Sequence, residues 1–149
     1  MSYSYFVAEL QCPGCGTSTE STVMTKVESD PGTVIRVGDP LDVTVIDMKY
    51  SHYTLRVPEP GEPLRILESW SCPACGRPGW IEIVVDDGHV RSIDVVPFDT
   101  ATLDRVNFVA DQLAEFYEEK AGEPLYVGDE VRPDWMERLR QHLARPGTP

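Results

Sequence analysis

Two short cysteine motifs constrain this chain of 149 residues more than any other feature. The motifs read C-P-G-C-G at residues 12–16 and C-P-A-C-G at residues 72–76. A gap of two residues lets one turn direct both sulfurs of a motif at a single ion, while proline fixes the entry to the turn and the last glycine permits its left-handed exit. The sequence therefore predicts that Cys12, Cys15, Cys72 and Cys75 together hold one metal ion.

A set of four cysteine ligands is typical of structural zinc, so one zinc ion is the expected cofactor. Iron is the less favoured alternative, because four thiolates also hold the iron of electron-transfer proteins. A redox-active cysteine pair is a third interpretation, in which one thiolate lies at the start of a helix. The residues after each motif do not open a helical pattern, and a redox enzyme needs only one such motif, so metal binding is favoured.

The two motifs resemble those of the zinc-ribbon class and, more loosely, those of the uncharacterised bacterial CpXC-type proteins. The resemblance covers the cysteines, prolines and glycines of both motifs and implies metal binding through Cys12, Cys15, Cys72 and Cys75. In compact ribbons about 15–20 residues separate the two cysteine pairs. Here residues 16–71 separate them, which predicts a long β insertion between the two halves of one site.

The remaining pattern predicts an α+β fold in two parts. Residues 1–98 read as an antiparallel β-rich, zinc-ribbon-like unit, and residues 99–149 as a C-terminal helical extension packed on the same core. Expected strands cover residues 3–10, 19–27, 33–37, 43–48, 50–57, 64–70, 80–85 and 89–96. After Pro97 the apolar period becomes helical, which predicts one helix over 101–121, capped at Asp99 or Thr100 and ended by Gly122. A second helix is expected to start at Pro133-Asp134, and no repeat is evident beyond the two motifs.

The charge balance restricts the partners. Thirteen basic and 25 acidic residues give 13 − 25 = −12, which disfavours nucleic acid and anionic membranes and favours a neutral or basic protein partner. No signal peptide is evident, and no apolar run approaches the ~20 residues of a membrane-spanning helix. These features, with a preference for arginine over lysine, predict a cytoplasmic bacterial protein.

No catalytic motif is evident elsewhere. His52, His89 and His142 lack a cysteine or carboxylate at a diagnostic spacing and are interpreted as surface or packing residues. Trp70 and Trp80 flank the second motif and are expected to pack near the metal site, with an exposed aromatic anchor as the alternative.

The sequence thus predicts a non-catalytic structural-zinc protein that acts as a protein–protein interaction or accessory module. Alternatives are a zinc-binding regulatory protein of the antitoxin type, a rubredoxin-like electron carrier, and an inhibitor or immunity-type protein that covers a basic enzyme surface. The antitoxin interpretation is weakened because no basic recognition helix follows a partner helix at short spacing.

Overall fold

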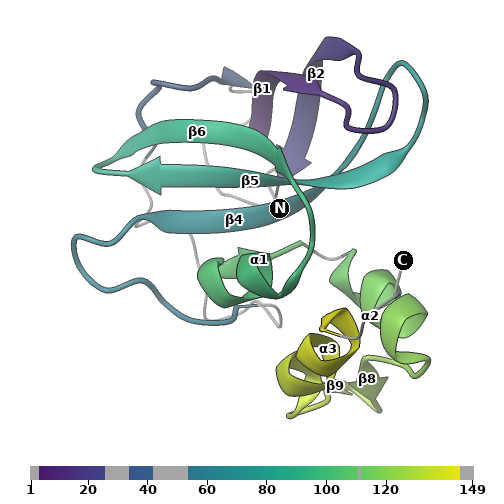
Figure 1. Cartoon of the computed structure of the whole chain (residues 1–149). Coiled ribbons are helices and arrows are strands. Elements are labelled where there is room, and N and C mark those ends of the chain that lie inside the picture. Colours follow the sequence, from purple (N-terminus) through teal and green to yellow (C-terminus); the bar gives the residue numbers. More distant parts are fainter. Residues whose placement is uncertain (1–3, 26–33, 42–53, 111, 145–149) are drawn as a thin grey trace.

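The computed structural model describes residues 4–25, 34–41, 54–110 and 112–144 (Figure 1). Within them the predicted α+β class is confirmed, because mostly antiparallel sheets are followed by helices. The first sheet has the order β2-β1-β3, formed by Ser18–Thr25, Ser4–Gln11 and Val34–Ile35. The second has the order β6-β5-β4-β7, formed by His89–Val96, Pro78–Asp86, Leu64–Ser71 and Phe108–Val109.

The C-terminal part carries α1 (Thr100–Arg105), α2 (Leu113–Ala121) and α3 (Trp135–Leu143). A small hairpin of β8 (Tyr126–Val127) and β9 (Glu130–Val131), which the sequence pattern does not predict, joins α2 to α3. The expected strand at 43–48 lies outside the described residues, as does the first half of the one at 50–57. None of the helices in the described ranges has the length and apolar character needed to cross a membrane.

Each cysteine motif forms the turn of one antiparallel hairpin, β1–β2 or β4–β5, and the two hairpins are copies of one pattern. A shift of 60 residues, from Cys12 to Cys72, superimposes the strand bounds of β1 and β4. The same shift carries buried positions onto buried positions: Phe6, Val7, Leu10, Cys12, Ser21 and Val23 correspond to Ile66, Leu67, Trp70, Cys72, Ile81 and Ile83. In both copies a short strand then pairs in parallel with the first strand of the hairpin. The internal repeat therefore extends well beyond the two motifs, contrary to the expectation from sequence.

Two hydrophobic clusters lie on the two faces of the second sheet. One contains side chains of both hairpins, including Phe6, Ile66, Ile83 and the buried cysteines, so it joins the first sheet to the second. The other contains Leu67 of β4 together with buried side chains of α1, α2 and α3. Figure 1 shows the helices on one side of the β4–β6 sheet and the β1–β2 hairpin on another, with both motif turns at the same end of the molecule.

The predicted single helix over 101–121 is wrong. The chain forms α1, leaves the helix at Val106, pairs as β7 with β4 and then forms α2. The reason is the edge of β4, whose backbone groups need partners. Asn107 supplies them, because its N–H donates to the Arg65 carbonyl at 2.9 Å and its side-chain oxygen accepts from the Arg65 N–H at 2.8 Å.

Other local predictions are confirmed. Asp99 caps α1 by accepting from the Thr102 N–H at 2.9 Å, and Gly122 ends α2 in the left-handed conformation. Asp134 is the N-cap position of α3, as the second predicted helix start requires. The strands expected over 80–85 and 89–96 form the β5–β6 hairpin, with Asp87 at φ 51° in its turn.

A buried carboxylate links the second sheet to α1. Glu82 of β5 faces the helices and is 7% exposed. Its oxygens accept hydrogen bonds from Arg105 of α1 at 2.9 Å and from Arg65 of β4 at 3.1 Å. Two charged donors compensate for the loss of water around a buried carboxylate, so this triad holds α1 against the sheet.

Candidate metal centre

The two motif turns, called knuckles below, have the same backbone structure. In the first, the Cys12 N–H donates to the Thr17 carbonyl at 3.0 Å and the Gly16 N–H donates to the Cys12 carbonyl at 2.8 Å. The equivalent bonds of the second knuckle have the same lengths, 3.0 and 2.8 Å. The last glycine of each motif has φ 74°, the left-handed conformation that the sequence predicts.

The structure brings the sulfurs of Cys12, Cys15, Cys72 and Cys75 within 4.8 Å of one another. None of the four is in a disulfide. The closest pairs join different knuckles, with 3.7 Å between the Cys12 and Cys75 sulfurs and 3.8 Å between those of Cys15 and Cys72. Each pair combines one buried and one exposed cysteine, as the two-fold repetition of the hairpins requires. The cluster is thus positioned to bind one metal ion.

The distances between sulfurs allow a direct test of fit. Four sulfurs at ~2.3 Å from a tetrahedrally coordinated zinc ion would be ~3.8 Å from each other. The two closest cross-knuckle distances, 3.7 and 3.8 Å, match this edge of the tetrahedron. The four cysteines therefore fit a tetrahedral metal ion, and within the described ranges no other group of three or more potential ligands gathers in this way.

The protonation of the cluster differs between the knuckles. Hydrogen bonds from the Thr17 hydroxyl and the Thr17 N–H lower the pKa of Cys15 to about 6. The N–H of Arg77 makes the corresponding bond to Cys75, but loss of contact with water and the three neighbouring thiols raise the pKa of Cys75 to about 11. The N–H of Cys15 similarly holds the pKa of Cys12 below its ordinary value. A metal ion must therefore displace a proton from Cys75 but finds Cys15 largely ionised at neutral pH.

The knuckles also touch through a side chain. A Cβ atom at Gly14 would lie only 2.7–3.0 Å from atoms of the Arg77 side chain, so Arg77 of the second knuckle lies over Gly14 of the first. The second motif has Ala74 at the equivalent position. A methyl group at position 14 would therefore require the Arg77 side chain to shift.

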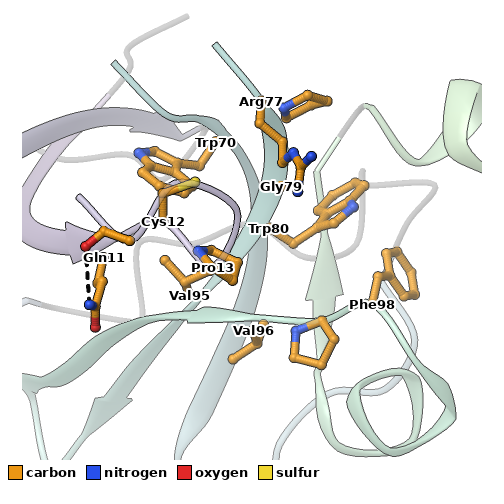
Figure 2. Close-up of a pocket in the computed structure, with 13 residues that line it drawn as sticks. Gln11, Cys12, Pro13, Trp70, Arg77, Gly79, Trp80, Val95, Val96 and Phe98 are labelled. Atoms are coloured by element: carbon orange, nitrogen blue, oxygen red, sulfur yellow. Dashed lines mark hydrogen bonds between the residues drawn. The ribbon is translucent and has the colours of Figure 1, made fainter. Parts of the chain in front are cut away.

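The aromatic residues beside the second knuckle have different roles. Trp70 is buried in the cluster that contains Cys12 and Cys72, as the packing interpretation predicts. Trp80 is half-buried and makes edge-to-face contacts with Phe98 at 5.0 Å and Phe116 at 5.6 Å between ring centroids. Both tryptophans line a cavity beside the metal cluster (Figure 2).

The histidines that the sequence offers are not part of the cluster. The ring of His89 is exposed at the β5–β6 turn, with Nδ1 2.9 Å from the Asp87 carbonyl. His142 lies in the last turn of α3, and His52 lies outside the described residues.

Sequence reasoning missed two residues that shape the site. Thr17 and Arg77 occupy equivalent places after the two motifs, yet Thr17 lowers the pKa of the Cys15 thiol and Arg77 crosses to the other knuckle. Comparison of the residues just after each motif would have signalled this asymmetry. The arginines of α3 are paired with carboxylates: Arg138 with Glu123 and Asp134, and Arg140 with Asp104.

Comparison with known protein families, with curated proteins and with solved structures finds no significant match to this chain.

Proposed function

We propose that this chain is a structural-zinc protein in which one ion, held by Cys12, Cys15, Cys72 and Cys75, joins two repeated hairpins. The observation that carries the proposal is the convergence of four free thiols with cross-knuckle distances of 3.7 and 3.8 Å. The resemblance of the motifs to zinc ribbons supports zinc as the ion. When bound, the ion supplies a cross-link between segments that are far apart in the sequence.

A non-catalytic role follows from the ligand set. Zinc with four protein ligands has no coordination position left for water or substrate, whereas catalytic zinc keeps one open. The chain then acts as an interaction or accessory module. Its formal charge of −12 becomes −14 when four thiolates and one divalent ion add −2, and this acidity favours a neutral or basic protein partner.

Metal analysis of the purified protein tests the first half of this proposal. We expect one zinc per chain and four thiols that react with a thiol reagent only after chelation. Protein that contains no metal, or thiols oxidised to disulfides under reducing purification, would contradict the proposal.

Iron is the second candidate metal, because the same sulfur tetrahedron accepts it and because Cys15 and Cys75 are exposed, as an electron-transfer site requires. An iron-containing protein would be red in its oxidised state. A colourless protein with stoichiometric zinc would exclude the electron carrier.

The interaction half needs a separate test. Zinc-loaded protein immobilised on a resin should retain a neutral or basic protein, and the purified pair should bind less tightly as salt is raised, because salt screens complementary charges. Salt-sensitive binding to duplex DNA instead would favour the regulatory, antitoxin-type alternative.

A further inference from the structure

A cavity of about 600 Å³ lies beside the first knuckle, where β5 begins and β6 ends. Its volume falls within the range of about 300–1,000 Å³ typical of small-ligand sites. Most of its wall is apolar or aromatic, with contributions from Pro13, Trp70, Trp80, Val95, Val96 and Phe98 (Figure 2). The nearby Gln11 side chain already donates to the Gly16 carbonyl at 3.2 Å and is not available to a ligand without losing that bond.

The aromatic wall is fixed by its surroundings. Phe98 is stacked on Phe116 with ring centroids 4.3 Å apart, and the edge of Trp80 meets both rings. At Gly79 the wall has no side chain, and the atom nearest to a Cβ placed there would be 3.7 Å away in Trp70. The cavity is therefore lined by rings held in place and includes a position that could hold a larger residue.

Arg77 supplies the basic group of this cavity. Within the described ranges its guanidinium makes no hydrogen bond or ion pair, whereas Arg65, Arg105 and Arg138 all pair with carboxylates. The space left by Gly14 positions the Arg77 side chain at the wall. An unpaired guanidinium beside an apolar wall is suited to a carboxylate, which it can bind through two parallel hydrogen bonds.

From this arrangement we infer that the cavity binds an apolar, planar group that carries a single carboxylate, with the ring against the aromatic wall and the carboxylate on Arg77. One guanidinium matches one negative charge. A polyanion such as a nucleic acid would be repelled by a chain of net charge −12, because Arg77 is the one unpaired cation among the described residues that line the cavity. The inference extends beyond the proposed metal-binding function.

Two sources provide this chemistry: a free aromatic acid, or the C-terminal residue of a protein chain that ends in an aromatic side chain. The second source would deepen the proposed interaction function. The two are distinguished with 3-phenylpropionate as the free acid and acetyl-Gly-Phe with a free carboxylate as the chain end, each compared with its carboxamide.

The measurement uses the full-length, metal-loaded protein and the indole N–H signals of its three tryptophans in nuclear magnetic resonance spectra. Trp70 and Trp80 line the cavity, while Trp135 lies in the helical cluster and serves as an internal reference. We expect at least one acid to shift the Trp80 signal in a saturable way and to bind about tenfold more tightly than its amide, because only the acid pairs with the guanidinium. The acid that binds more tightly identifies the source.

Two variants test the geometry. Arg77→Gln should reduce binding of the acid about tenfold, to the level of the amide. The matched control Arg91→Gln removes another arginine without a described partner, from β6 and outside the cavity wall, and should leave binding unchanged. Gly79→Val should block binding of acids and amides alike, because the added side chain occupies part of the cavity. The spectrum of the folded protein should persist, because a Cβ atom at this position makes no close contact with the backbone.

Absence of binding by both acids, equal binding of acid and amide, or unchanged binding in Arg77→Gln would overturn the inference. Tighter binding of phenyl phosphate than of the acids would do the same. Metal content measured on the same samples keeps this outcome separate from that of the zinc proposal, because a zinc-loaded protein that binds no acid contradicts only the inference about the cavity.

Discussion

Removal of the metal ion should destabilise the fold by an amount that depends on the number of residues between the two knuckles. An ion that joins Cys12 to Cys72 closes a loop of 72 − 12 = 60 residues. The chain-entropy relation for cross-links gives about 4 kcal/mol for a loop of this length at 25 °C. In a domain of this size each kcal/mol corresponds to roughly 2–4 °C, so the midpoint of thermal unfolding should fall by roughly 10 °C.

Denaturation in guanidinium chloride, followed by circular dichroism, measures this difference between metal-loaded and chelated protein. The double variant Cys12→Ser/Cys15→Ser lacks one knuckle's sulfurs and should already be as unstable as the chelated wild type. Chelator should then have no further effect on it. If the chelated wild-type protein unfolds at the same denaturant concentration as the loaded protein, the hydrophobic cluster between the two sheets holds the knuckles together and the cross-link argument fails.

Three further predictions concern protons and buried charge. Because the pKa of Cys75 is about 11, binding of the ion at neutral pH releases at least one proton. The logarithm of the metal association constant should therefore rise by at least about one unit per pH unit between pH 7 and 9, and an association constant independent of pH would contradict this. Thr17→Val removes a hydroxyl donor to Cys15, whose pKa is about 6 in the wild-type protein. The thiolate absorbance of the metal-free variant should therefore titrate at higher pH than that of the wild type, whereas Thr17→Ser should keep the low pKa. Replacement of Arg65 and Arg105 by methionine leaves the buried charge of Glu82 unpaired and should lower the free energy of unfolding by about 3–5 kcal/mol. Additional replacement of Glu82 by leucine should recover most of that loss. Failure to recover it would show that the arginines stabilise the fold in another way.

Local sequence patterns predicted local structure well. The motif spacing predicted that the four cysteines gather in one cluster, Asp99 and Gly122 marked helix ends, and the expected strands at 80–85 and 89–96 form the β5–β6 hairpin. These signals succeed because capping, left-handed turns and two-residue sulfur spacing depend on residues that are adjacent in the chain.

The helix predicted over 101–121 shows the limit of this reasoning. The apolar positions Leu103, Val106, Val109 and Leu113 are all buried, so the periodicity correctly identified the inward face. It did not reveal that residues 108–109 pair with β4 rather than continue the helix. The choice depends on the unpaired edge of a strand about 40 residues earlier, which no local window of sequence contains.

The hairpin repeat was hidden for a related reason. The six buried positions of the first copy are also buried in the second, but the two copies share little residue identity outside the motifs, since Leu10 corresponds to Trp70 and Ser21 to Ile81. Burial is a property of the folded chain, so the equivalence became visible only when both sheets were assembled around one cluster.

The amino-acid sequence alone predicted the four-cysteine cluster, the acidity and the mixed class of the fold, because each depends on composition or on spacing along the chain. Tertiary structure decided how the four sulfurs meet and how Arg77 of one knuckle comes to lie over Gly14 of the other, at the wall of an aromatic cavity. These properties arise from contacts between segments about 60 residues apart, and only the packing of one hairpin against its copy creates such contacts.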